Sequence, residues 1–126
     1  MIKGALWIVL TEESKNRIRQ ICPPIFSKVY IDHVTLQYNI ELPEEYKPYV
    51  DSTQKILLKE ICHNDKIQAI YVGIKLPSKN KFPHITISAK EGVHSVESNQ
   101  MLESEHESTS IPGEIRVEGI VKFLPI

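Results

Sequence analysis

The sequence has few of the features that mark several large classes of protein. Its two cysteines, Cys22 and Cys62, are too few for a disulfide framework and are not spaced as a metal knuckle. The apolar run Ala5–Leu10 is too short to span a bilayer, and Met1-Ile-Lys leads straight into it, so we expect no signal peptide. The sequence therefore predicts free thiols, no membrane contact and a cytoplasmic location, in the host if the source is a virus or phage.

An excess of charge of either sign is also missing. The formal net charge is −1 at pH 7, so the chain has no strongly basic character with which to grip a long nucleic-acid backbone. A nucleotide or a short oligonucleotide is a better match for such a protein. Hydrophobic residues make up 41% of the 126 residues, which is enough to bury one core, and we predict a single domain over residues 1–126.

Metal-binding spacings are absent as well. The five histidines include no His-x-x-x-His pair, and the cysteines form no Cys-x-x-Cys pair. His63 falls in an expected turn, and His94 and His106 fall in polar segments, so we expect all three on the surface. The sequence predicts neither a metal nor a cofactor.

Two matching stretches stand out against this background, each with a His-x-Thr triplet: His33-Val-Thr35 and His84-Ile-Thr86. Successive side chains of a β-strand point to opposite faces, so the histidine and threonine of each triplet share a face. The apolar residues alternate with them and are expected on the opposite face: Val34, Leu36, Tyr38 and Ile40 in the first stretch, and Ile85, Ile87 and Ala89 in the second.

A pair of imidazoles with a hydroxyl beside each suits phosphodiester cleavage by general acid–base catalysis. One histidine can take a proton from the attacking oxygen while the other gives a proton to the leaving oxygen. Threonine hydroxyls can bind the non-bridging phosphate oxygens. The sequence shows no third group that would make Thr35 or Thr86 a nucleophile, which disfavours a covalent intermediate. It leaves open which histidine is the base.

Further substrate-binding candidates lie near the triplets. Gln37 and Ser88 come two residues after each threonine, on the expected polar face. Tyr71 lies opposite the apolar row of its strand and is a candidate for stacking on a base, whereas Trp7 is expected in the core. Lys81 ends a polar loop before the second triplet, where it would attract phosphate unless it is simply a solvated loop lysine.

The remaining pattern predicts about six strands and two helices. Thr11 is expected to cap a helix that Pro23-Pro24 ends, and a polar turn at 63–65 is expected to join two arms of a hairpin. Residues 96–102 are predicted to be helical with Ser95 as the cap. The other assignments are strands at 3–10, within 26–40, at 54–62, 66–76, 82–88 and 115–124, a loop or single helical turn at 41–50, and loops at 77–81 and 103–110.

The two triplets, set among apolar strand residues, resemble the signature of the 2H phosphoesterase superfamily. The stretches Pro83–Ala89 and Gly92–Leu102 are also similar to the cyclic phosphodiesterase domain of fungal-type tRNA ligases, and to related RNA-repair-like and phage or viral 2H phosphodiesterases. The resemblance spans nearly the whole chain. It implies a bilobal α+β fold in which two antiparallel sheets form a central cleft, with one motif on each lobe.

The resemblance also implies roles for the four motif residues. His33 and His84 would be the acid–base pair, and Thr35 and Thr86 would bind the phosphate. The predicted function is a metal-independent phosphodiesterase that hydrolyses a 2′,3′-cyclic phosphate of an RNA end or nucleotide, or a cyclic or 2′-5′-linked oligonucleotide. One alternative is a nucleotide-binding module that sequesters its ligand, and a weaker one is a structural α+β protein whose strands have polar faces. The oligomeric state cannot be read from the sequence.

Overall fold

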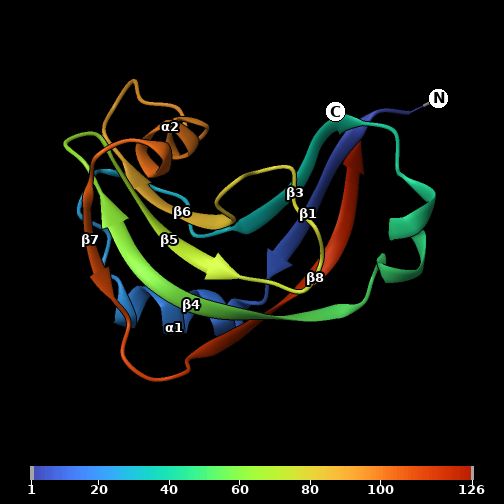
Figure 1. The fold of residues 1–126 in the computed structure, drawn as a ribbon, viewed down its shortest axis with the longest axis horizontal. Coiled ribbons are helices and arrows are strands. Elements are labelled where there is room, and N and C mark those ends of the chain that lie inside the picture. Colours follow the sequence, from blue (N-terminus) through green and yellow to red (C-terminus); the bar gives the residue numbers. More distant parts are fainter. Residues whose placement is uncertain (1, 126) are drawn as a thin grey trace.

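Six antiparallel strands close into a barrel in the computed structural model of the chain, which describes residues 2–125 (Figure 1). Two short strands extend the sheet beyond the ring, β2 (Lys28–Val29) beside β6 and β7 (Glu107–Ser110) beside β4. The order around the ring is β6 (His84–Ala89), β3 (His33–Ile40), β1 (Gly4–Leu10), β8 (Arg116–Pro125), β4 (Thr53–His63) and β5 (Ile67–Gly73), which pairs again with β6.

The expectation of two separate sheets on two lobes is not confirmed. The strands that carry the two motifs, β3 and β6, pair with each other at Val34 and Ile85, and β6 continues into β5 on its other side. These two pairings merge the strands into one closed sheet, so the fold is mostly β with few helices. The two triplets are therefore on neighbouring strands and not on facing sheets.

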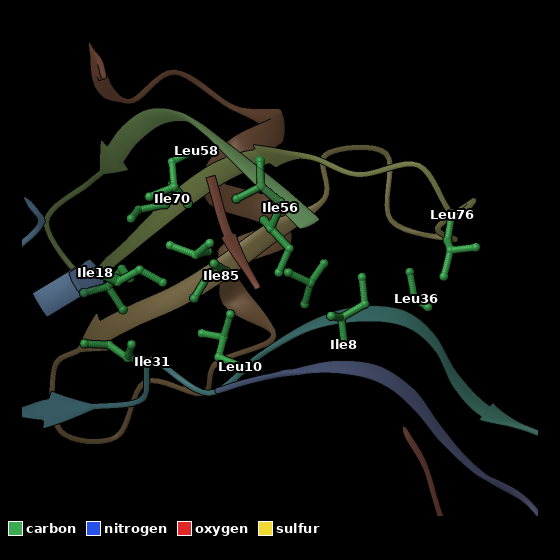
Figure 2. Close-up of a cluster of buried hydrophobic side chains, with 14 of the residues drawn as sticks. Ile8, Leu10, Ile18, Ile31, Leu36, Ile56, Leu58, Ile70, Leu76 and Ile85 are labelled. Atoms are coloured by element: carbon green, nitrogen blue, oxygen red, sulfur yellow. The ribbon is translucent and has the colours of Figure 1, made fainter. Parts of the chain in front are cut away.

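The barrel interior is filled by aliphatic side chains from every strand of the ring (Figure 2). Leu6, Ile8 and Leu10 alternate along β1 and are buried, as period two requires for a strand with one face on a core. Helix α1 (Glu12–Ile21) adds the fully buried Ile18 to this core. A second, smaller cluster lies between α2 (Glu97–Glu103) and β5, with Met101 and Leu102 packed near Ala69.

The predicted start and end of α1 are confirmed. The Thr11 side chain accepts a hydrogen bond from the Ser14 backbone N–H at 3.2 Å, and Glu12 and Glu13 occupy the first turn, where the helix dipole favours negative charge. Cys22 caps the other end, directly before the two prolines, which fit poorly in a continuing helix. No helix among residues 2–125 is long and apolar enough to cross a membrane.

The predicted hairpin is also confirmed, and its turn has a clear cause. The Asn64 side-chain oxygen accepts hydrogen bonds from the N–H groups of Lys66 at 2.8 Å and Ile67 at 2.9 Å, so it closes the turn between β4 and β5. The expected turn within 41–50 is a 3₁₀ helix, η1 (Glu44–Tyr49).

Two local predictions are wrong. Residues 107–110 form β7 and not a loop; all four side chains are exposed, so no apolar alternation marks the strand. Helix α2 is capped by Val96 without a side-chain hydrogen bond, and not by Ser95. Its first turn is instead tied by the Glu97 carboxylate, which accepts a hydrogen bond from the His94 N–H at 2.9 Å.

Candidate active site

A pocket of about 630 Å³ lies where β1, β3 and β6 meet the loop before β6 and the start of α2. Both histidines and both threonines of the triplets line it, so the structure brings together the four residues that the sequence singles out. The full lining is Trp7, Tyr30, Asp32, His33, Thr35, Tyr38, Asn80, His84, Thr86, Ser95, Val96 and Asn99.

The pairing of β3 with β6 explains how the triplets meet. Val34 is opposite Ile85, and both side chains are fully buried in the barrel core. Because the strands are antiparallel, the residues on either side of this pair cross over, which sets His33 beside Thr86 and Thr35 beside His84. Each histidine thus lies next to the threonine of the other motif on the pocket side of the sheet.

His33 is held from two directions. Its Nδ1–H donates a hydrogen bond of 2.9 Å to the Asp32 carboxylate, and its ring stacks on the Trp7 indole with centroids 3.7 Å apart. Burial lowers the pKa of His33 below its usual value because the charged ring loses water, and the Asp32 carboxylate opposes this shift. The ring is therefore fixed through Nδ1, and Nε2 is the nitrogen available for proton transfer.

His84 is held differently. Its Nδ1–H donates a hydrogen bond of 2.8 Å to the Phe82 carbonyl oxygen, and only 8% of the residue is exposed. Burial lowers the pKa of His84, the bond to Phe82 opposes this, and the nearby His33 lowers it further. The donor role of Nδ1 makes Nε2 an acceptor in the neutral ring.

The two threonines are anchored by serines on different segments. The Thr86 and Ser98 hydroxyls share a hydrogen bond of 2.9 Å, which ties β6 to α2. The Thr35 backbone carbonyl accepts a hydrogen bond of 3.0 Å from the Ser78 hydroxyl, which ties the loop before β6 to β3. Through these contacts the loop and α2 form the rim of the pocket.

A β-bulge follows each threonine and changes which residues face the pocket. In β3, Thr35 is opposite Trp7 but Gln37 is opposite Leu6, so the strand has one extra residue there. In β6, Thr86 is opposite Ala69 but Ser88 is opposite Gln68, which is the same irregularity at the same place. Because a bulge adds one residue, the side chains that follow it point to the opposite faces from those that strict alternation predicts.

Because of the bulges, three predictions are wrong. Gln37 was expected in the pocket but lies on the same face of the sheet as the buried Leu6. Tyr38 was expected on the apolar face but lines the pocket, with 63% of its surface exposed. Ser88 is fully buried, where its hydroxyl donates a 2.7 Å hydrogen bond to the Gln68 side-chain oxygen. It also accepts hydrogen bonds from the N–H groups of Ile25 and Phe26, so its position is structural.

Tyr71 and Lys81 lie away from the pocket lining. Tyr71 packs edge-on against Phe82 in the smaller core cluster, with the Lys59 ammonium 5.1 Å from its ring. The exposed Lys81 extends over the Phe82 ring at 5.5 Å. Trp7, by contrast, was expected in the core but lines the pocket.

The sequence analysis does not predict several residues of the pocket lining. Asp32 could have been predicted, because an acidic residue directly before a candidate catalytic histidine often holds the histidine ring. Tyr38 required knowledge of the bulge, and Asn80, Ser95 and Asn99 lie on a loop and around a short helix, where no periodicity marks a face. Among residues 2–125, no three His, Cys, Asp or Glu side chains are grouped so as to hold a metal ion.

Comparison with known proteins identifies a family. A family model described as the fungal tRNA ligase phosphodiesterase domain matches residues 9–123, which include every residue of the pocket lining except Trp7. No curated protein gives a significant match to the chain.

Proposed function

Because the chain belongs to the fungal tRNA ligase phosphodiesterase domain family, which suggests cyclic phosphodiesterase activity, we propose that it hydrolyses a 2′,3′-cyclic phosphate on a nucleotide or an RNA end. The observation that carries the proposal is the crossed arrangement of the two triplets in one pocket. Two imidazoles, each held through Nδ1, and two hydroxyls surround a space large enough for a nucleotide.

In the proposed reaction, one imidazole Nε2 takes a proton from water, whose oxygen attacks the phosphorus. The bond from phosphorus to one ribose oxygen breaks, and the other imidazole gives its proton to that oxygen. The product is a phosphomonoester beside a free hydroxyl. Thr35 and Thr86 donate hydrogen bonds to the non-bridging oxygens, whose charge grows in the transition state.

We assign the acid role to His33 and the base role to His84. A carboxylate at Nδ1 and an indole face both stabilise a charged ring, and His33 has both partners in Asp32 and Trp7. His84 has the neutral Phe82 carbonyl at Nδ1, which orients the ring without a full negative charge. The protonated ring is therefore favoured at His33 and the neutral ring at His84.

The test is product analysis by chromatography and mass spectrometry with EDTA present. The panel comprises nucleoside 2′,3′-cyclic phosphates, 2′-5′ oligoadenylate and cyclic dinucleotides. Cleavage of the 2′,3′-cyclic phosphates supports the proposal, and His33→Ala and His84→Ala should each lower turnover by about 10²–10⁴-fold, the usual contribution of a general acid or base. His63→Ala, at the last residue of β4 and outside the pocket lining, is the matched control.

Three outcomes would contradict the proposal. Recovery of intact nucleotide after tight binding would indicate a sequestering module, and cleavage of another member of the panel alone would assign a different substrate. Loss of activity in EDTA that added metal restores would contradict the metal-independent mechanism.

A further inference from the structure

A lysine on helix α1 contacts the carboxylate that holds His33. The Lys15 ammonium lies 3.6 Å from Oδ1 of Asp32, while Oδ2 of the same carboxylate accepts the 2.9 Å hydrogen bond from His33. The backbone brings these groups together, because the Leu10 N–H donates a 2.9 Å hydrogen bond to the Asp32 carbonyl directly before α1 begins. Lys15, Asp32 and His33 thus form a continuous chain of charged or ionisable groups that ends in the pocket.

Partial burial distinguishes the contact with Asp32 from the contact of Lys15 with Glu12. The Lys15 side chain is 23% exposed; the Asp32 side chain is 47% exposed, whereas the Glu12 side chain, 3.4 Å from the same ammonium, is 86% exposed. Water screens the pair with Glu12 strongly, and exposed pairs of this kind contribute little. The contact with Asp32 is therefore the one through which Lys15 acts on the site.

We propose that Lys15 is a positioning residue that orients the Asp32 carboxylate and partly neutralises it, so that His33 releases its proton to the leaving oxygen more readily. The inference rests on the proposed function, in which His33 is the acid. Without Lys15, the full carboxylate charge would stabilise the imidazolium and make His33 a weaker acid.

The direction in which Lys15 changes the pKa of His33 follows from the surrounding charges. Asp32 stabilises the imidazolium form of His33. Lys15 destabilises that form in two ways, because it attracts the Asp32 carboxylate and also repels the imidazolium directly. The first turn of α1 carries a partial positive charge that acts in the same direction as Lys15, while Glu12 weakly offsets it. His84 faces His33 from β6 and also disfavours a second charge.

Apart from Asp32 and the two histidines, the residues that line the pocket carry no carboxylate, ammonium or guanidinium group, and the Lys28 ammonium lies behind the lining, 5.8 Å from the Tyr30 ring. Strand β1 presents the Trp7 indole, the pocket wall presents the phenols of Tyr30 and Tyr38, and the loop before β6 presents the Asn80 amide. Around α2 the lining residues are Ser95, Val96 and Asn99. The ion pair of Lys15 with Asp32 is therefore the formally charged contact through which we expect α1 to act on the acidity of His33.

The experiment is an NMR titration of the histidine ring protons in the full chain without substrate. His33→Ala identifies the His33 resonance. We expect Lys15→Met to raise the pKa of His33 by a few tenths of a unit and at most about one, as for a partly screened ion pair. Lys15→Arg keeps the charge and should keep the pKa. Lys47→Met removes the same charge from a similar i,i+3 pair with Glu44 in η1 and should also leave it unchanged.

A second background tests whether Asp32 transmits the effect. In Asp32→Asn, which removes the shared carboxylate, Lys15→Met should shift the His33 pKa less than it does in the parent protein. An unchanged or lowered pKa in Lys15→Met, or an equal shift in both backgrounds, would overturn the proposal. The titration requires no turnover, so its result is independent of whether the 2′,3′-cyclic phosphates are cleaved.

Discussion

The Trp7 indole and the His33 imidazole lie face to face, with centroids 3.7 Å apart and planes 10° from parallel. Trp7 comes from β1 and His33 from β3, and the two strands pair antiparallel. The stack therefore links the position of a proposed catalytic ring to the register of two barrel strands. It also gives an imidazolium an aromatic face, which favours the charged form.

Removal of this stack should slow the reaction without unfolding the protein. We expect Trp7→Ala to lower kcat by roughly 3–30-fold, because a cation–π contact contributes about 0.5–2 kcal/mol and the ring of His33 also gains freedom. Trp7→Phe should recover part of the loss. Steady-state kinetics beside thermal unfolding provide the check, and an unchanged kcat in folded Trp7→Ala would show that the stack has no role.

Tyr38 should contribute to substrate binding more than to chemistry. It lines the pocket, is 63% exposed, and offers an aromatic face on which a base can stack. We expect Tyr38→Ala to raise KM by roughly 5–150-fold with a small change in kcat, since stacking contributes about 1–3 kcal/mol per base. Tyr49→Ala, at a partly exposed tyrosine in η1, is the matched control. Equal KM values for the two variants would contradict this role.

The pH dependence of kcat/KM should show a maximum on the acidic side of neutrality. Burial lowers the pKa of both His33 and His84 below the usual value of about 6.5. The productive form needs one ring protonated and one neutral, and it is most populated midway between the two pKa values. We therefore expect a bell-shaped profile with its maximum below about pH 6.5. A profile that keeps rising above neutrality would be inconsistent with the two lowered pKa values.

Ser88 should affect stability and not substrate binding. Ser88→Ala removes an acceptor for the partly buried N–H groups of Ile25 and Phe26 and the buried donor to the Gln68 side chain, while the Ile25 N–H keeps Gln68 Oε1 as its other acceptor. We expect a loss of roughly 1–3 kcal/mol in the free energy of unfolding, the cost of leaving buried polar groups without a partner. Urea unfolding measures the loss, and KM at a temperature where the variant is folded should match the parent. A raised KM with unchanged stability would return Ser88 to the substrate site.

The strands and the motif faces were readable from the sequence because they depend on local alternation. His33 and Thr35, separated by the buried Val34, follow period two without interruption, as do the corresponding residues of β6. The capping of α1 by Thr11 is equally local. These features need no knowledge of strand partners.

Features that depend on strand pairing were not readable. The bulges after Thr35 and Thr86 exist only relative to the neighbouring strands β1 and β5, so no pattern within the motif marks them. The same holds for Trp7, whose apolar run shows no alternation that would reveal a pocket-facing side. The sheet closes because β3 pairs with β6, which is far away in the sequence. The similarity of the two stretches does not predict that they pair with each other.

The pairing of Val34 with Ile85 has a consequence for the direction of the reaction. Two antiparallel strands with the same triplet, each followed by a bulge, are related by an approximate twofold axis through this pair. A phosphate on that axis would meet one imidazole and one hydroxyl from either side, so the motifs alone do not distinguish its two ester oxygens. The asymmetry comes from the groups behind the rings, the Asp32 carboxylate and the Phe82 carbonyl. In the proposed reaction, these groups outside the two triplets would therefore select which bond opens.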